Sequence, residues 1–298
     1  MTLPLTDNLR DLVDAIESTA VLSAAAARAL LNEAGITAEE LAPWRDFEHS
    51  AADGYGRRLI HDGGHYELMV MSWRDGSMSA IHDHGYTTWG AVQLFGDAEH
   101  ATFLHQGQTL CTGSRRTVPA GTVMAVSHEL IHQMGNVSQP PYFTLHLYGS
   151  EDCEPGGVTH NARLFDLDEG AIQFTNGGVF FALPEAQINR RCFGLTADFP
   201  TTLRHNMEVI YRLSQSGGGV RMTRLLDWLC ATQTRLDAAA ERAGARPDVN
   251  ATSRRYQASY RQELAAAHRI IRQLVSAGSV HAEQAATLQE ALRGLDIG

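Results

Sequence analysis

The sequence predicts a mainly β fold, a jelly-roll-like barrel with helices before it and an all-α region after it. Between about residues 52 and 183, seven short runs with alternating apolar residues are separated by glycines, which is typical of a β-sandwich or barrel. Residues 6–48 and the residues after Pro184 instead repeat their apolar positions with helical spacing. We therefore expect a barrel domain with its N-terminal helices over residues 1–184 and a helical extension over residues 185–298.

The individual elements follow from local patterns. Helical spacing predicts helices in "DNLRDLVDAI" and in "AAAARALLNEAG", where Gly35 is the expected C-cap, and "TAEELAPW" predicts a short third helix. The expected strands are "HYELMVMSW", "GAVQLFG", "AEHATFLHQ", "GTVMAVS", "YFTLHLYG", "ARLFDL" and "GGVFFAL". The expected C-terminal helices are "RHNMEVIYRL", "RMTRLLDWLCATQTRLDAAAERAG", "SRRYQASYRQELAAAHRIIRQLVSAG" and "AEQAATLQEALRG".

Charge and composition exclude some classes of partner. The chain carries a net charge of −10, divided into −14 over residues 1–184 and +4 over residues 185–298. An acidic main domain argues against nucleic acid as its partner. No run approaches the ~18 apolar residues that a membrane span needs, so no membrane partner is expected.

The N-terminus and the cysteines indicate a reducing compartment. The first residues, "MTLPLTDNLRDLVDAIES", have acids where a signal peptide would have a basic start and an apolar stretch. Four cysteines, Cys111, Cys153, Cys192 and Cys230, are scattered without a CxxC pair, which favours reduced thiols over a disulfide framework or a zinc site. We expect a cytoplasmic protein.

Two histidine motifs indicate a metal site. "SAIHDHGYTTWG" places His82 and His84 one residue apart, so in a strand both imidazoles would point to one face. "PAGTVMAVSHELIHQMGN" then supplies His132, with an asparagine four residues later. Together they resemble the two signature motifs of the cupin superfamily, which implies that His82, His84 and His132 meet on one metal. His128 competes for the third position, but the asparagine spacing favours His132.

The identity of the metal follows less directly. Many cupins add a glutamate four or five residues after the second histidine, where this chain has Thr88 and Trp89, and Asp83 is expected to face away. Three neutral imidazoles with open coordination positions suit Fe(II) that must bind both a substrate and O₂. Zinc, nickel and copper also accept imidazole ligands, so the ligand set alone does not identify the metal.

The run "FTLHLYG" adds a second pattern. Thr144, His146 and Tyr148 alternate, so in a strand all three point to one face. They could form a relay of hydroxyl, imidazole and phenol in which His146 sets the orientation and acidity of the Tyr148 hydroxyl. The alternative is an amphipathic strand whose polar face is simply wet. The nearby histidine motifs favour the relay.

Three blocks, "YGRRLIHDGGHYELMVMSWRDGSMSAIHDHG", "HELIHQMGNVS" and "FTLHLYG", resemble the cysteine dioxygenase family of thiol dioxygenases over about residues 5–183. The resemblance implies an Fe(II) cupin enzyme that uses O₂ to oxidise the sulfur of a small thiol such as cysteine to a sulfinate. It implies three histidine ligands, and a relay in which Thr144 replaces the family's serine. Within the Tyr55–Leu59 segment, it makes Arg57 the anchor for the substrate carboxylate.

The sequence also departs from this family. The cysteine that animal enzymes cross-link to the active-site tyrosine falls near Trp89 or Gly90, so no thioether can form, and Trp89 is expected to narrow the substrate pocket. Relatives acting on mercapto-acids carry their arginine after the relay strand, where Arg163 stands here. Residues 185–298 exceed the usual family length, and we expect them to cover the barrel or form a homodimer interface. A further-transformed sulfur product of specialised metabolism is therefore also considered.

Two other functions remain. A cupin sensor with a helical DNA-binding domain would suit the positive C-terminal region, although its arginines are interleaved with acids and no helix-turn-helix is evident. A non-redox metal-dependent cupin enzyme would suit zinc or nickel, although the expected relay and the missing glutamate count against it.

Overall fold

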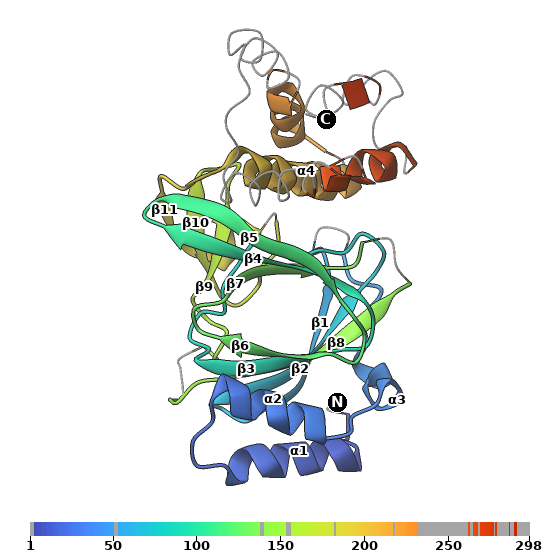
Figure 1. Ribbon diagram of the computed structural model, residues 1–298, viewed down its shortest axis with the longest axis vertical. Helices are drawn as coiled ribbons and strands as arrows, with labels where there is room; N and C mark the ends of the chain where they lie inside the picture. The colour runs from blue at the N-terminus through green and yellow to red at the C-terminus, as the bar shows by residue number, and fades with distance from the viewer. Residues whose placement is uncertain are drawn as a thin grey trace, which may run out of the picture. The chain divides into compact units, whose positions relative to one another are not determined.

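The computed structural model divides into two compact units (Figure 1). The first, called the barrel unit here, comprises Met1–Phe103, Arg116–Phe165 and Ile172–Cys192, and the second unit comprises Leu104–Arg115, Asp166–Ala171 and Phe193–Gly298. The structure describes residues 3–50, 53–137, 140–152, 156–181, 183–216, 218–229, 231, 262, 265–267, 269–276, 278, 286, 289 and 290.

The N-terminal helices form as the sequence predicts, except that the second helix has Ala34 as its C-cap and the expected Gly35 follows with a φ of +63°. Helix α1 spans Asp7–Ser18, α2 spans Ala24–Glu33 and α3 spans Ala38–Leu41, followed by the 3₁₀ helix η1 over Ala42–Trp44. The side chains of Thr6 and Ser23 accept backbone hydrogen bonds at the starts of α1 and α2, because the first amides of a helix lack partners within it. The apolar stripes of both helices are buried.

A five-stranded antiparallel sheet lies against these helices (Figure 1). Its order is β1-β2-β8-β3-β6, in which the strands span Gly56–Asp62, Tyr66–Trp73, Tyr142–Gly149, Trp89–Leu94 and Val123–Ser127. Alternate residues point to opposite faces of a strand. Leu145 and Leu147 of β8 therefore pack with α1 and α2, while Tyr142 and Tyr148 belong to the cluster inside the barrel.

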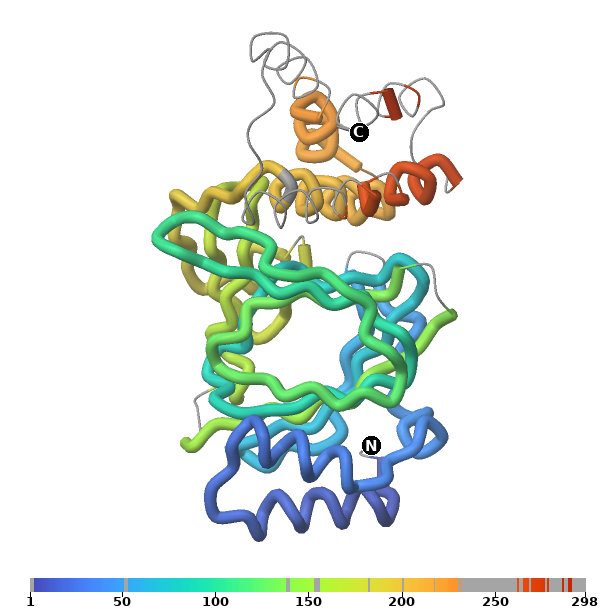
Figure 2. Tube along the Cα trace, in the orientation of Figure 1, coloured from blue at the N-terminus to red at the C-terminus, as the bar shows by residue number. Residues whose placement is uncertain are grey.

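A second sheet faces the first, and together they close a barrel (Figure 2). Its order is β12-β5-β4-β7, with bounds Thr196–Ala197, Thr109–Val118, Ala98–Gln106 and Ile131–Gly135. A third sheet, β11-β10-β9, comprises Ile188–Phe193, Ala171–Thr175 and Ala162–Asp166. The expected mainly β barrel with N-terminal helices is confirmed.

Some expected elements differ in place. The described residues of the run "GGVFFAL" do not form a strand, and the preceding "AIQFT" forms β10 instead. After Pro184 the chain forms the 3₁₀ helix η3 (Glu185–Gln187) and strand β11 before any α-helix, because "INRRCF" pairs with β10. Helix α4 spans Phe199–Gln215 and so begins before the predicted run "RHNMEVIYRL". Asp198 caps its start, and a proline occupies its first turn.

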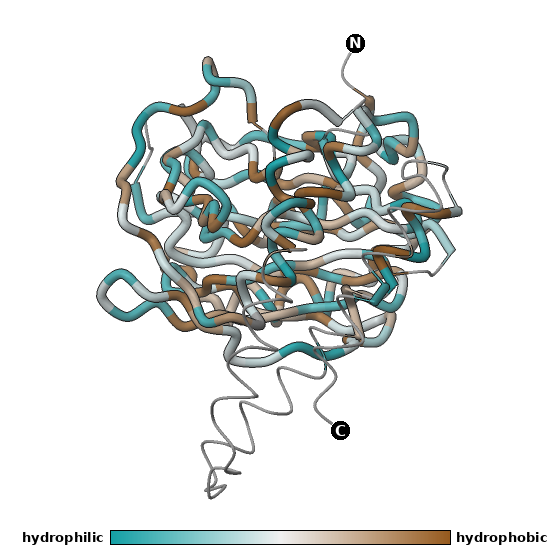
Figure 3. The backbone as a smooth tube through the Cα atoms, turned by 90° about the horizontal axis from the view of Figure 1, so that it is seen from above, coloured by the Kyte–Doolittle hydropathy of each residue, from teal (hydrophilic) through white to brown (hydrophobic). Residues whose placement is uncertain are grey.

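The later helices are described only in part. Residues 220–229 and 269–276 are helical, in agreement with the patterns there, while most of the chain from residue 230 onward lies outside the described residues. The expected roles of this region, barrel cover or dimer interface, lie there too. Hydrophobic and hydrophilic residues are interspersed along the described chain (Figure 3). Among the described residues, no helix is long and apolar enough to cross a membrane.

The second unit contains a buried carboxylate with charged partners. Asp166 accepts a hydrogen bond from the Arg221 guanidinium at 2.9 Å and lies 3.3 Å from Nε2 of His205. Arg221 also donates to Asp168 at 2.6 Å. Burial by itself would raise the pKa of Asp166, but the contacts with His205 and Arg221 lower it to about 2.

Candidate metal centre

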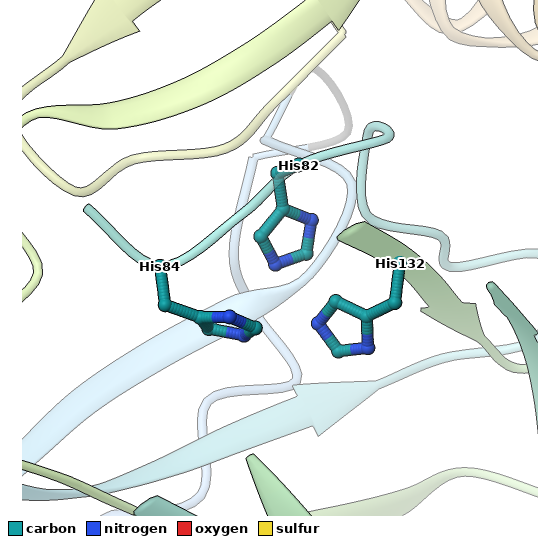
Figure 4. A group of neighbouring side chains, drawn as sticks. All are labelled: His82, His84 and His132. Atoms are coloured by element: carbon teal, nitrogen blue, oxygen red, sulfur yellow. The ribbon is translucent and has the colours of Figure 1, made fainter. Parts of the chain in front are cut away.

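Backbone pairing brings the two histidine motifs together. The amide of His82 donates to the carbonyl of His132 at 3.0 Å, and the amide of His132 donates back at 2.9 Å. Residues 79–88 form this bridge, a second bridge between His82 and Leu164, and turns, rather than the regular strand expected from the H-x-H spacing. His84 still lies on the same side as His82, and the three rings converge (Figure 4).

The three side chains form a compact, buried cluster. One ring nitrogen from each histidine lies within 4.8 Å of the others. Their ring centroids are separated by 4.6 Å between His82 and His132, 4.8 Å between His84 and His132, and 5.3 Å between His82 and His84. The competitor His128 is not part of this cluster, since its Nδ1 lies 3.3 Å from the carbonyl of Thr87.

The hydrogen bonds of the rings leave nitrogens for a metal. Nδ1 of His82 donates to the carbonyl of Ala80 at 2.8 Å, so its Nε2 carries the lone pair. Among the described residues, Nε2 of His132 and both nitrogens of His84 are buried without a hydrogen-bond partner. Unpaired buried polar atoms are costly, and a cation held between the three rings would satisfy one nitrogen of each.

Protonation also suits metal binding. Burial lowers the pKa of His82 to about 4 and holds the pKa values of His84 and His132 well below their usual range. The three rings are therefore neutral at pH 7, as nitrogen ligands must be. The residues present fit a mononuclear metal ion with three imidazole ligands and no carboxylate.

The segment that carries His84 is held firmly. Asp83 faces away from the cluster, as expected, and accepts hydrogen bonds from the backbone and the side chain of Arg163 at 2.7 and 2.5 Å. Gly85 follows with a φ of +59°, and a Cβ there would lie 2.1 Å from the carbonyl oxygen of His160. Only glycine fits this turn, so the close approach fixes the position of the neighbouring ligand.

The predicted hydroxyl–imidazole–phenol pattern forms a continuous chain of hydrogen bonds. Oγ1 of Thr144 lies 2.6 Å from Nε2 of His146, and Nδ1 of His146 lies 2.7 Å from the hydroxyl of Tyr148. Trp73, which the sequence did not single out, donates its indole N–H to Thr144 at 2.9 Å. All four side chains are buried, so the alternative of a wet strand face does not apply.

The electrostatics of this chain favour neutral groups. Burial lowers the pKa of His146 to about 3, and the positive charge of Arg57 adds to the effect. Burial likewise raises the pKa of the Tyr148 phenol above its ordinary value. Tyr148 therefore remains a protonated phenol at neutral pH. Its ring lies beside the cluster, with its centroid 5.2 Å from that of His84.

A small pocket of about 20 Å³ joins the cluster, Tyr148 and Arg57. The Arg57 guanidinium lies 3.1 Å from the Thr159 hydroxyl, 3.4 Å from the carbonyl of Gly177 and 3.5 Å from the carboxylate of Glu67. Its side chain is 28% exposed. Tyr55 also lines the pocket and stacks on Trp73 at a centroid distance of 4.8 Å.

Two expected substrate residues lie elsewhere. Trp89 does not narrow the pocket, because it packs with Leu68 and Leu147 on the opposite face of the sheet, beneath the N-terminal helices. Its neighbour Gly90 is the residue that faces inward, and a Cβ there would lie 3.1 Å from the Tyr148 ring. Arg163 does not line the pocket either, since its guanidinium is paired with Asp83.

A fourth buried histidine, which the sequence did not single out, contacts the cluster. Nε2 of His100 lies 2.9 Å from Nδ1 of His132. The only signal for this residue in the sequence is that the predicted strand "AEHATFLHQ" has a histidine among small and apolar residues. The sequence cannot show that this strand pairs with the one carrying His132.

The sequence profile of the family described as cysteine dioxygenase type I matches residues 4–151. This part of the chain belongs to the cysteine dioxygenase family. The matched segment of this cysteine dioxygenase domain contains all three clustered histidines, the complete relay and Arg57, whereas Arg163 lies beyond it.

Solved structures similar to this chain include three bacterial proteins. A protein with a double-stranded β-helix domain from Klebsiella pneumoniae is 17% identical, with a TM-score of 0.30, and the match covers 40% of this chain and 91% of that chain. An RmlC-like cupin protein from Desulfovibrio desulfuricans is 14% identical, with a TM-score of 0.26 and coverages of 32% and 81%. KdgF from a Halomonas species is 15% identical, with a TM-score of 0.28 and coverages of 37% and 88%.

Proposed function

We propose that the chain is a mononuclear non-haem Fe(II) thiol dioxygenase acting on cysteine or a close relative of it. The observation that carries the proposal is one small pocket in which His82 and His84, two members of the three-histidine cluster, meet the Tyr148 phenol and the Arg57 guanidinium. Each has a separate use: the imidazoles suit a metal with open positions, the guanidinium suits a carboxylate and the phenol suits hydrogen bonding to reacting oxygen atoms.

His82, His84 and His132 would hold the iron. Fe(II), when bound there, would supply the positive charge that favours the thiolate form of the substrate and the open positions that bring thiolate and O₂ together. In the overall reaction, R–SH and O₂ give R–SO₂H. Sulfur is oxidised and O₂ is reduced, so no other reductant is needed. Further transformation of the sulfinate in specialised metabolism stays a prediction.

Arg57 would anchor the carboxylate of the substrate. A guanidinium can donate two parallel hydrogen bonds to a carboxylate, and such charge-assisted pairs are the strong ones. Thr159 and the Gly177 carbonyl hold the guanidinium beside the pocket. Arg163 is less suited, because binding a substrate would require it to leave Asp83. These contacts favour a cysteine-like substrate over a mercapto-acid.

Tyr148 would donate its phenolic proton to an oxygen atom of the reactants. If the Thr144 hydroxyl donates to Nε2 of neutral His146, Nδ1 of His146 carries the proton that the Tyr148 oxygen accepts. The Tyr148 O–H is then directed away from the relay and into the pocket. The contact with Trp73 supports this direction of the hydrogen bonds. Its indole N–H donates to the Thr144 oxygen, so the Thr144 hydroxyl proton is left to donate to His146.

We also propose a cytoplasmic location and a homodimer formed through the C-terminal helices. The four scattered cysteines without a CxxC pair support the first, and the apolar stripes of "RLLDWLCATQTRL" and "YRQELAAAHRIIRQLV" support the second. Analytical ultracentrifugation of the full chain would test the dimer, and a monomer at micromolar concentration would contradict it.

The activity is tested by loading the full chain with Fe(II) without oxygen and then adding O₂ with a panel of thiols. The panel contains cysteine, cysteamine, homocysteine and 3-mercaptopropionate, and products are identified by mass spectrometry. We expect cysteine, or its closest analogue in the panel, to gain two oxygen atoms, both derived from ¹⁸O₂. Iron-loaded protein that consumes neither O₂ nor any of these thiols would contradict the proposal and favour a non-redox cupin enzyme.

A further inference from the structure

His100 lies directly behind one of the three clustered histidines. It belongs to β4, which pairs with β7 so that Thr102 lies opposite His132 and His100 lies opposite Met134. A diagonal cross-strand neighbour is within reach of a long side chain. The His100 ring reaches back in this way, with its centroid 5.1 Å from that of His132 and the two ring planes at 62°. His100 is itself buried.

The proton positions in this pair follow from the geometry. Nε2 of His132 is the nitrogen without a partner and faces the cluster, so it must be unprotonated to bind a metal. The proton of the neutral ring then sits on Nδ1 of His132, 2.9 Å from His100. Nε2 of His100 can only accept it. The contact therefore selects one tautomer and one ring orientation of His132.

We propose that His100 is a positioning residue that holds His132 in the tautomer and orientation needed for metal binding. This inference rests on the metal site of the proposed function. Groups that accept a proton from a metal-bound histidine typically change the metal affinity by about 10- to 100-fold when they are removed. Here the acceptor is a second imidazole, a neutral group, where carboxylates and backbone carbonyls commonly serve.

The orientation of His132 can be tested by mutation, whereas the orientations of His82 and His84 cannot be tested in the same way. His82 is oriented by the backbone carbonyl of Ala80, which no side-chain substitution removes. His84 has no hydrogen-bond partner on either nitrogen among the described residues. His132 is thus the ligand whose orientation depends on a side chain that can be replaced without altering the cluster itself.

A pocket of about 360 Å³ lies behind this pair and makes chemical rescue feasible. His100 and His132 line its buried end, together with apolar side chains such as Val92 and Leu130, while Arg28 and Arg116 line it and are exposed to solvent. Shortening His100 to alanine would add the space of an imidazole ring to this pocket. Free imidazole could then enter from solvent and accept the proton of His132.

The experiment measures binding of Fe(II) and of Co(II), without oxygen, to the full-length wild-type chain and to His100 variants. His100→Gln keeps a hydrogen-bond acceptor at similar reach, and His100→Leu has similar bulk but no acceptor. We expect about 10- to 100-fold weaker binding for His100→Leu, with most of the affinity kept in His100→Gln. For His100→Ala we expect a similar loss that imidazole partly reverses, while imidazole gives wild-type protein no gain. His128→Ala, a control nearby, should bind as wild type does.

The outcomes separate this inference from the proposed function. Wild-type chain that binds neither metal would overturn both. If the wild type binds and His100→Leu binds equally tightly, only the role of His100 is overturned. Equal losses in His100→Gln and His100→Leu, without imidazole rescue of His100→Ala, would also overturn it, because they would mean that the packing of the ring matters and its acceptor does not. Circular dichroism spectra equal to wild type establish that the compared variants are folded.

Discussion

At the scale of single residues, the metal centre depends on three side chains that cannot replace one another. With no carboxylate in the cluster, losing one imidazole leaves two ligands, too few for a stable site. We expect about one iron per wild-type chain and none in His82→Ala, His84→Ala or His132→Ala. His128→Ala is the control and should keep its iron. Full iron content in all three ligand variants, measured by plasma emission spectrometry, would show that the metal binds elsewhere.

Arg57 and Arg163 differ in what they already bind, and this difference predicts their effects. Arg57→Ala should raise the KM for cysteine by roughly 30- to 1,000-fold, since losing a charge-assisted pair costs about 2–4 kcal/mol. Arg57→Lys should recover little, because an ammonium lacks the two-pronged geometry. Arg163→Ala should change KM far less.

Arg58→Ala is the matched control, since Arg58 is the next residue of β1 and pairs with Asp46 on the exposed side. Steady-state kinetics of O₂ consumption over a range of thiol concentrations would measure all four variants. A larger effect at Arg163 than at Arg57 would reverse the assignment and indicate a mercapto-acid substrate.

What the sequence reveals of individual residues depends on motif spacing. The His82–His84 pair and the relay follow from local patterns, because the i and i+2 positions of an extended chain share a side. That His132 joins the pair follows from the resemblance to the cupin motifs. The expectation that Trp89 narrows the pocket came from the family resemblance, which left Trp89 and Gly90 both possible, and the alternation along the strand decides between them. Val92 and Leu94 face the barrel interior, so Gly90 does too and Trp89 must face the helices.

At the scale of elements, the two faces of strand β8 have different roles. One face packs on the helices, and the other presents the relay. We expect Tyr148→Phe to keep its iron and fold while turnover falls by roughly 10- to 1,000-fold, the range of lost acid–base or hydrogen-bonding roles. Rapid mixing of the reduced, thiol-loaded protein with O₂ measures the rate.

Tyr142→Phe is a control on the same face of β8. Its hydroxyl donates to the carbonyl of Gly135 and does not line the small pocket. This variant should retain turnover close to wild type even if some stability is lost. Equal rates for Tyr148→Phe and the wild type would reduce the relay to a structural contact.

The strands that the sequence predicts well are those with strong alternation, such as β4 and β8. It misplaces β10 and β11, because glycine-rich and polar runs give weak period-2 signals and their pairing partners decide the outcome. Pairing between distant strands is equally hidden. The β4–β7 register that places His100 behind His132 could therefore not be read from either strand alone.

At the scale of the whole molecule, acid should destabilise the second unit through Asp166. The folded-state pKa of about 2 lies below the ordinary value of 3.8, so the contribution to stability is complete above about pH 4 and disappears as the pH falls through 2. The difference corresponds to about 2 kcal/mol. Urea unfolding at pH 5 and at pH 2 should show Asp166→Asn losing about that much less stability on acidification than wild type.

Asp11→Asn, at an exposed position of α1, is the control and should retain the acid dependence of the wild type. If Asp166→Asn and the wild type show the same acid dependence, the charged contacts of Asp166 do not stabilise the folded chain.

The backbone pair between His82 and His132 also bears on how fast the protein is degraded. A metal ion held by both side chains acts as a cross-link between distant parts of the chain, and cross-links lower the entropy of the unfolded state. Iron-free chain should then be cut faster by thermolysin than iron-loaded chain, and His128→Ala should preserve that difference. A cell short of iron would accumulate less of this protein, because the form that cannot work is also the form most readily degraded.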